Sequence, residues 1–197
     1  MNSPYDGLSD DQWVQKTREL IKQHPISTQE LYDVVIQSWD SIFQSSIGTK
    51  PFRIGHDIFP APQIMGFLLH ELIPLELTFR YPTLWHKGIK ATDKDLIYIP
   101  NDNFSIEIKT SSSGKNIYGN RSYAQETTTS KKSKSGYYLA VNFEKFSSTI
   151  QIPRIALIRF GWLDHTDWMG QFSASGQQAR LSPQVEKSKL LILPLSE

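Results

Sequence analysis

The residues that could do chemistry concentrate in one segment, residues 95–114, which reads DLIYIPNDNFSIEIKTSSSG and carries acids and a lysine at regular spacing. Because side chains alternate between the two faces of a strand, Glu107 and Lys109 project from the same face. The isoleucines beside them point the other way and would anchor the strand in a core. The strand would therefore hold a carboxylate and an ammonium group together on one face.

The turn before Glu107 decides whether Asp95 joins these two residues. If it is an odd-length loop centred on Asn101, Asp95 lies directly across from Glu107, with about 5 Å between their Cβ atoms. An even-length loop would shift the pairing by one residue and separate the two carboxylates. Facing carboxylates repel each other unless a cation lies between them. Oxygen ligands suit Mg²⁺, which usually takes one or two protein carboxylates and fills its shell with water and substrate phosphate.

Lys109 completes a set of groups that could hydrolyse a phosphodiester. Beside a metal ion, its amine can orient or deprotonate a water molecule and stabilise charge on the phosphate under attack. The alternative is simple charge alternation on a surface strand, which often produces a Glu-x-Lys pattern. The apolar residues around Glu107, the aspartate at hairpin spacing and the basic segment that follows favour a metal-dependent nuclease.

Charge is unevenly distributed along the chain, although the formal net charge is only +1. Residues 108–145 hold seven lysines and arginines against two glutamates, whereas residues 1–50 hold seven acids against four bases. This asymmetry indicates an anionic partner held by the middle of the chain, with a solvated basic loop as the alternative. The absence of cysteine excludes a disulfide framework and a thiolate zinc site, and fits a reducing compartment.

Length and hydropathy set expectations about location and domains. The first residues show no basic region followed by an apolar run, and no window approaches the roughly 20 apolar residues of a membrane helix. We therefore expect a soluble, cytoplasmic protein with a single domain over residues 1–197. Within it we expect N-terminal helices in 1–50, a catalytic core in 55–163 and a C-terminal extension in 164–197.

Hydrophobic periodicity predicts helices first and strands later. Three segments have helical patterns: residues 9–24, a stretch from Ser27 or Thr28 to Gly48, and a stretch that starts at Pro60 or Pro62 and that Pro74 ends or kinks. Four segments have strand patterns: residues 95–99, 104–109, 135–143 and 151–163. Residues 120–133 fit either a helix or an ordered polar loop. This order predicts a mixed α/β sandwich in which helices cover a central sheet.

With these elements in place, the sequence resembles the PD-(D/E)XK nuclease superfamily. Asp95, Glu107 and Lys109 match its motif in order and spacing, although Lys94 stands where a proline often precedes the aspartate. The resemblance implies a restriction-endonuclease-like core with a central mixed β-sheet flanked by helices, and Asp95 and Glu107 as Mg²⁺ ligands. Glu71 matches a helix glutamate that supports the metal in some members, and an exposed helix acid is the alternative.

A narrower resemblance is to the type II restriction endonucleases of the ScaI family. It rests on four segments: EIKTSSSGKNIYGNRSYAQ (107–125), SGYYLAVNF (135–143), RFGWLDHTDWMGQ (159–171) and GQQARL (176–181). It implies a homodimer that cuts double-stranded DNA at a short palindrome with Mg²⁺. Two alternatives stay open, a repair or recombination nuclease on the same core and a DNA-binding protein without catalysis.

The basic segment also supplies candidate DNA contacts, because amide and guanidinium groups can bond two atoms of a base edge and lysines pair with phosphates. The candidates are Lys115, Asn116, Asn120, Arg121, Ser122, Tyr123 and Gln125, followed by Lys131, Lys132 and Lys134 as a flexible phosphate clamp. Tyr118 and Tyr123 would pack against sugar or base, and Gln177, Gln178 and Arg180 are further candidates. For each residue, an ordered polar loop is the alternative.

A second group of potential metal ligands lies in WLDHTDW, where Asp164, His165 and Asp167 are close in sequence. The long strand before them and the flanking aromatic residues favour a structural turn over a metal site. The histidines at positions 56, 70 and 86 show no ligand spacing.

Overall fold

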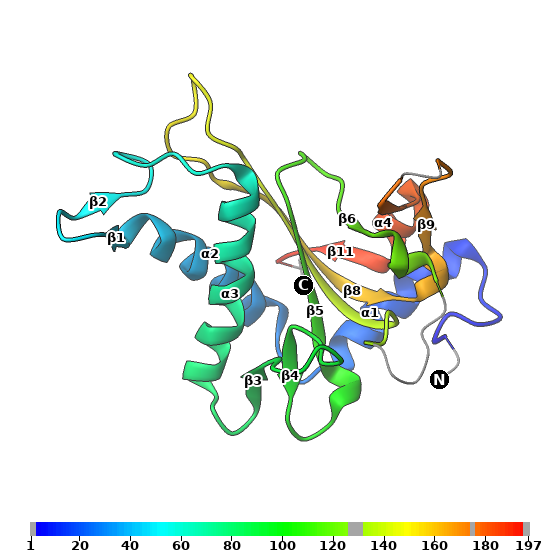
Figure 1. The fold of residues 1–197 in the computed structure, drawn as a ribbon. Coiled ribbons are helices and arrows are strands. Elements are labelled where there is room, and N and C mark those ends of the chain that lie inside the picture. Colours follow the sequence, from blue (N-terminus) through cyan, green and yellow to red (C-terminus); the bar gives the residue numbers. More distant parts are fainter. Residues whose placement is uncertain (1–2, 126–131, 174–175, 195–197) are drawn as a thin grey trace.

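A six-stranded mixed sheet forms the centre of the computed structural model, which describes residues 3–125, 132–173 and 176–194 (Figure 1). Its strands are β3 (Trp85–Lys87), β4 (Leu96–Tyr98), β5 (Ile106–Ser111), β7 (Gly136–Phe143), β8 (Ile155–Leu163) and β11 (Leu190–Ile192). They are ordered β11-β8-β7-β5-β4-β3; β5 and β7 run parallel, and the other neighbours run antiparallel. The predicted central mixed sheet is confirmed.

Helices flank this sheet, as predicted. Their bounds in the described ranges are α1 (Trp13–Gln23), α2 (Thr28–Gln44), α3 (Pro62–Arg80) and α4 (Pro183–Lys189). Ser27 caps α2 by accepting a hydrogen bond from Glu30 N at 3.1 Å. Pro62 is the first residue of α3. The N–H groups of the first turn make no hydrogen bond within a helix, so the N–H that proline lacks is not needed there. In the part of the chain that the structure describes, no helix combines the length and hydropathy that crossing a bilayer requires.

The structure decides the ends of two helices. Of the two outcomes expected at Pro74, an end or a kink, the end is excluded, because α3 continues to Arg80. Ile73 and Leu77 are fully buried, so packing before and after the proline offsets the hydrogen bond that Pro74 cannot donate. α2 stops at Gln44, before the predicted Gly48, and a small hairpin of β1 (Ser46–Ile47) and β2 (Phe52–Arg53) follows it.

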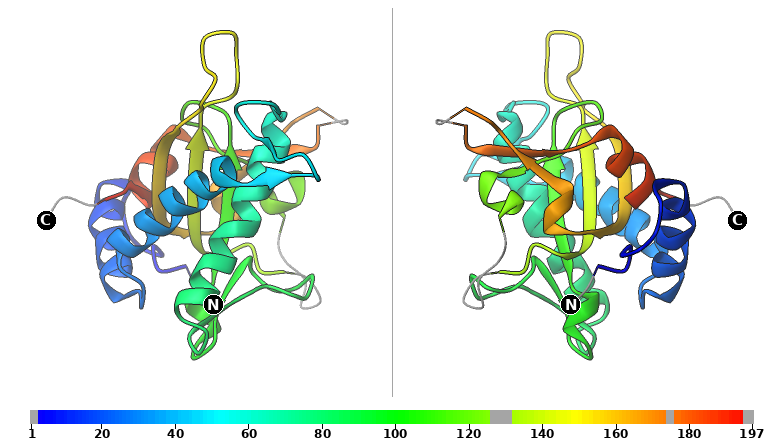
Figure 2. Two further views of the ribbon diagram at one scale, coloured as in Figure 1. Left: turned by 90° about the vertical axis from the view of Figure 1, so that its left-hand side faces the viewer. Right: turned by 90° about the vertical axis from the view of Figure 1, so that its right-hand side faces the viewer.

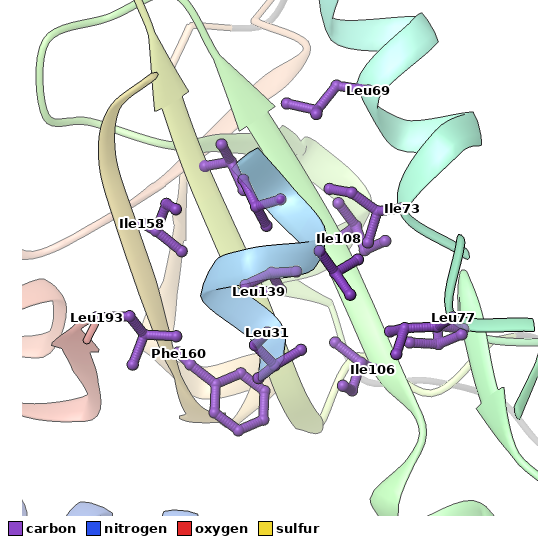
Figure 3. Close-up of a cluster of buried hydrophobic side chains, with 14 of the residues drawn as sticks. Leu31, Leu69, Ile73, Leu77, Ile106, Ile108, Leu139, Ile158, Phe160 and Leu193 are labelled. Atoms are coloured by element: carbon purple, nitrogen blue, oxygen red, sulfur yellow. The ribbon is translucent and has the colours of Figure 1, made fainter. Parts of the chain in front are cut away.

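One face of the central sheet packs against α2 and α3 and forms the larger core (Figure 3). Ile106 and Ile108 of β5 project into this core, where Leu31 of α2 and Leu69 and Ile73 of α3 meet them. All five side chains are almost completely buried. Because the isoleucines are fixed on this face, the residues between and after them must face the opposite side of the sheet.

A second layer covers that opposite side (Figure 2). It consists of α4 and a three-stranded sheet, β6-β10-β9, made of β6 (Tyr118–Asn120), β9 (Trp168–Gly170) and β10 (Gln178–Leu181). Tyr138 and Leu163 of the central sheet pack there against Trp168 and Leu181. The sequence did not predict this small sheet, α4 or β11, because elements of three to seven residues show too little periodicity.

The predicted strands are present with shifted ends. β8 begins at Ile155 instead of residue 151, and the connection from β7 projects beyond the rest of the molecule (Figure 2). β5 runs on to Ser111. In the undecided segment 120–133, the described part contains a 3₁₀ turn at Arg121–Ala124, and residues 126–131 lie outside the described ranges.

Candidate active site

The pairing of β4 with β5 brings the two predicted carboxylates together. Leu96 pairs with Ile106, so Asp95, one residue earlier, falls opposite Glu107. This is the register that an odd-length loop centred on Asn101 requires, and the prediction of facing carboxylates is confirmed.

Glu107 lies at the centre of a buried group of polar side chains. Its side chain is almost completely buried, and its Oε1 accepts hydrogen bonds from Lys109 Nζ at 2.6 Å and from the Tyr123 hydroxyl. Lys109 Nζ also donates to the Tyr123 hydroxyl at 2.8 Å, which closes a triangle of three groups. Glu107 Oε2 accepts no hydrogen bond from any described residue, and the Lys132 ammonium approaches it at 2.6 Å.

Asp95 is oriented by groups from two other elements. Its Oδ2 accepts a hydrogen bond from Ile108 N at 2.7 Å and lies 3.2 Å from His70 Nε2. Its Oδ1 lies 2.8 Å from Lys132 Nζ. Asp95 and Glu107 therefore each use one oxygen for a fixed protein contact and direct the other oxygen at the same ammonium group.

The surrounding cations keep both carboxylates ionised. Burial alone would raise the pKa of the Asp95 carboxyl, but the hydrogen bond from His70 and the charges of Lys109 and Lys132 hold that pKa well below its ordinary value. Burial likewise opposes ionisation of Glu107, but the charges of Lys109 and Lys132 lower its pKa in spite of burial and of the neighbouring Asp95. At neutral pH the site thus presents two negative charges.

The two open oxygens fit a divalent cation. Asp95 Oδ1 and Glu107 Oε2 converge on one point, and hard divalent cations prefer such carboxylate oxygens. Glu107 Oε2 is buried, and its partner among the described residues is the Lys132 ammonium at 2.6 Å, so this oxygen already faces a cation. The described ranges contain no cluster of three or more acids, histidines or cysteines around a metal position. Further ligands would therefore be water and substrate phosphate, as is usual for Mg²⁺.

Helix α3 brings His70 to the carboxylates, whereas the candidate Glu71 has another partner. Glu71 forms an ion pair with Lys87 of β3. Both α3 residues line a pocket of about 250 Å³ that also includes Asp95 and Lys132. No spacing in the sequence indicates the His70 contact, because only the packing of α3 beside β5 brings His70 close to Asp95.

Tyr123, one of the predicted DNA contacts, lies beside the carboxylates of the candidate site. Its ring is 7% exposed and packs on Trp168, with 5.3 Å between ring centroids. Burial and the charge of Glu107 raise the pKa of the Tyr123 hydroxyl well above its ordinary value, so the hydroxyl stays protonated and donates to Glu107.

The three lysines of the predicted phosphate clamp have different positions. Lys131 lies outside the described residues. Lys132 bridges the two carboxylates, and Lys134 Nζ lies over the Tyr123 ring, 4.2 Å from its centroid. The two described lysines therefore line the active site.

The residue before the first carboxylate, Lys94, is a buried lysine. Its Nζ donates to the Ser135 carbonyl at 3.1 Å, and burial lowers its pKa to about 8. Gly136 leaves room for it, since a Cβ at that position would lie 2.9 Å from the Lys94 amine. The buried Lys94 side chain thus depends on the missing side chain at Gly136.

Lys115 and Asn116 belong to a loop whose backbone is attached to the central sheet. Arg159 donates to the Lys115 carbonyl at 2.5 Å, and Asn142 donates to the Asn116 carbonyl at 3.0 Å. Both candidates line a pocket of about 690 Å³ together with residues of α1, α4 and β11. The structure does not bring them together with the carboxylates.

The candidates around the 3₁₀ turn lie nearer to the small sheet. Three of them are exposed: Asn120, Ser122 and Gln125. Arg121 Nη1 donates to the carbonyls of Ser173 and Gly176 at 3.2 and 3.3 Å, so this guanidinium supports the connection between β9 and β10.

A cleft adjoins the active site between α3 and the end of β5. Its volume is about 780 Å³, and His70 lines both this cleft and the smaller pocket beside Asp95. Hydroxyl, amide and aromatic groups make up much of its lining, including Gln63, Phe67, Thr110, Ser111, Tyr118 and Gln178. Two residues named above as DNA candidates, Tyr118 and Gln178, are therefore on this surface.

The acids of WLDHTDW form a structural turn, as the sequence favoured. Asp164 caps the 3₁₀ turn His165–Asp167 and contacts the His165 imidazole at 2.6 Å. Asp167 forms a buried ion pair with Lys189 at 2.7 Å. Protein partners thus account for both acids.

An aspartate and a Glu-x-Lys strand that converge on one cation position, on a mixed sheet between helices, define a metal-dependent nuclease of the restriction-endonuclease type. The family model for ScaI restriction endonuclease matches residues 3–194. The chain is also 48% identical over 194 residues to the type II restriction enzyme ScaI of Streptomyces caespitosus, covering 98% of this chain and 85% of that relative. The chain belongs to the ScaI restriction endonuclease family.

Membership in this family confirms the predicted resemblance and the activity class. The chain is a type II site-specific deoxyribonuclease whose substrate is DNA. A divalent metal cofactor goes with this class of enzyme. The repair nuclease and the non-catalytic DNA-binding protein, the two alternatives from the sequence, are set aside.

Proposed function

We propose that this chain is a Mg²⁺-dependent enzyme that hydrolyses phosphodiester bonds of double-stranded DNA at a short palindromic sequence. One observation carries the assignment of residues: Asp95 Oδ1 and Glu107 Oε2 are directed at one point from neighbouring strands, with the Lys109 amine bonded to the same glutamate. Asp95 and Glu107 are the proposed metal ligands, and Lys109 is the proposed residue at the attacking water.

Each group of the site has a proposed role in phosphodiester hydrolysis. A bound Mg²⁺ would supply Lewis-acid activation of water and of the scissile phosphate. Lys109 is held beside that position by Glu107 and Tyr123, where its ammonium can orient a water molecule and stabilise developing negative charge. The Ile108 N–H and His70 fix the direction of Asp95, so the ligand oxygens are oriented before substrate binds. Glu71, beside the same pocket, is a proposed supporting acid.

DNA binding is proposed for the cleft beside the carboxylates and for the exposed residues near it. The cleft carries the amides of Gln63 and Gln178, which can bond base edges or phosphates. Asn120, next to Gln178 in the β6–β10 pairing, extends this polar surface. We propose that a longer duplex reaches four further residues: Lys115, Asn116, Ser122 and Gln125.

A homodimer in the cytoplasm completes the proposal. A palindromic site has two-fold symmetry, which two copies of one chain can match. The absence of cysteine fits the reducing conditions of the cytoplasm. The mass of the enzyme bound to a short duplex, measured by analytical ultracentrifugation, should equal two chains and one duplex.

Digestion of phage DNA tests the proposed function. We expect discrete bands with Mg²⁺ and intact DNA when EDTA is added, since chelation leaves both carboxylates without their cation. A Lys109→Met variant is the matched control, because it should bind the same DNA without cutting it. A smear, cutting restricted to DNA junctions, or full activity in EDTA would contradict the proposal.

A further inference from the structure

Lys132 occupies the position that a divalent ion would take. Its Nζ lies 2.8 Å from Asp95 Oδ1 and 2.6 Å from Glu107 Oε2, the two oxygens left open by the other protein contacts. The Lys132 side chain is 16% exposed, that of Asp95 12% and that of Glu107 3%. Little water therefore shields these charges from one another. The ammonium therefore neutralises a repulsive pair of acids in the metal-free protein.

The two lysines of the site differ in how they are held. Lys109 contacts Glu107 and is also bonded to the Tyr123 hydroxyl at 2.8 Å and the Ile108 carbonyl at 3.3 Å. Among the described residues, Lys132 Nζ contacts only the two carboxylates. Lys109 would therefore keep its place when a cation arrives, whereas nothing else in the described structure retains Lys132.

An ammonium group and a divalent cation cannot both contact these two oxygens, because they would repel each other at close range. We infer that Lys132 is a positioning residue that holds the carboxylates in the metal-free enzyme and that metal binding displaces it towards a DNA phosphate. This inference rests on the proposed function of Asp95 and Glu107 as metal ligands.

The displacement couples metal binding to DNA binding. A phosphate that attracts Lys132 removes the competitor of the metal, and a metal that expels Lys132 frees a cation for the phosphate. Because such coupling is reciprocal, each ligand should strengthen binding of the other. The free enzyme would then bind metal weakly and fill the site fully only on DNA.

Titration calorimetry of Mg²⁺ into the DNA-free enzyme tests the competition. Lys132→Met should bind Mg²⁺ about tenfold more tightly than the unaltered enzyme, the effect of losing one charge-assisted contact. Lys22→Met removes the same charge from an exposed position in the last turn of α1 and should change the affinity by no more than about twofold. An unchanged or weaker Mg²⁺ affinity in Lys132→Met, or an equal gain in both variants, would overturn the inference.

Amine labelling of the unaltered enzyme tests the displacement without any substitution. With a limiting acetylating reagent and mass spectrometry, acetylation of Lys132 should rise several-fold when Mg²⁺ is added, while that of Lys109 stays low. An enzyme that cuts DNA with Mg²⁺ but shows no change at Lys132 refutes the displacement and leaves the proposed function standing. An enzyme that cuts no DNA with Mg²⁺ refutes the proposed function itself.

Discussion

At the scale of single residues, Tyr123 is the group that holds both Glu107 and Lys109 through its hydroxyl. Tyr123 donates to Glu107 and accepts from Lys109, so Tyr123→Phe should leave the carboxylate and the amine less well oriented. We expect kcat to fall about tenfold, the value of one hydrogen bond to a charged group, with KM changed by less than about twofold. Steady-state cleavage of a short duplex measures both constants. A raised KM with an unchanged kcat would instead show that Tyr123 contacts DNA.

Substitution of a carboxylate ligand should affect DNA cleavage and DNA binding differently. Asp95→Asn removes one charge of the pair that Lys132 bridges and weakens the cation site. Cleavage should fall by about 100-fold or more, because ligand loss lowers metal affinity and activity together. Binding of duplex DNA, measured by gel shift without metal, should be retained or tightened, since a negative charge beside the phosphates is gone. Cleavage near the unaltered rate would exclude Asp95 as a ligand.

The residues that sequence alone predicts are those whose positions follow from local geometry. Strand alternation places Glu107 and Lys109 on one face, and the odd-length loop places Asp95 opposite Glu107. His70 and Tyr123 reach the same carboxylates from α3 and from the turn after β6. Their approach depends on tertiary packing, which leaves no regular spacing in the sequence.

At the scale of elements, the edge strand β11 is held by a close approach that only glycine permits. A Cβ on Gly161 of β8 would lie 1.9 Å from the carbonyl oxygen of Lys189, which joins α4 to β11. Gly161→Ala should therefore separate β11 from β8 and lower the free energy of unfolding by about 3 kcal/mol. Urea unfolding followed by circular dichroism measures the change.

Gly114→Ala provides the matched control for this substitution. No atom lies within 4 Å of a Cβ at Gly114, and its backbone conformation suits any residue. Its unfolding free energy should stay within about 0.5 kcal/mol of the unaltered protein. Equal stability of the two glycine variants would show that β11 does not depend on the contact at Gly161.

Most of the elements that the sequence predicted are long, and the short strand β4 is an exception that its hairpin with β5 made visible. α2, α3, β7 and β8 carry enough residues for a helical or alternating pattern to appear. β6, β9, β10 and β11 have three or four residues each, and β6 and β11 pair with partners distant in sequence. The sequence left open whether α3 ends or is kinked at Pro74; the helix continues, because buried neighbours outweigh the local cost of proline.

At the scale of the whole molecule, two apolar layers enclose the polar site. The core under α2 and α3 fixes one face of β5, and the smaller cluster under β6, β9 and β10 closes around the other face. Tyr138 and Trp168 of the smaller cluster pack beside Tyr123, so the site is supported from its own side as well. The charges of Asp95 and Glu107 thus lie between two packed layers.

His24 links several parts of this fold and makes its stability depend on pH. The imidazole lies at the end of α1 among the rings of Trp85, Tyr137 and Phe160, and contacts the Phe104 carbonyl at 3.0 Å. Burial lowers its pKa from 6.5 to about 4, because the packed rings disfavour the charged form. The folded protein therefore resists protonation of a group that the unfolded chain protonates below pH 6.5.

Since the unfolded state binds the proton first, the stability that neutral His24 contributes is present above pH 6.5 and is lost as pH falls to about 4. The loss across this window should be about 3 kcal/mol, the equivalent of the lowered pKa. Urea unfolding at pH 7 and pH 4 should show His24→Gln losing about 3 kcal/mol less than the unaltered protein, because glutamine does not titrate. Equal losses in both proteins would mean that His24 opens to solvent before the fold does, and that the aromatic cluster around it does not unfold with the rest.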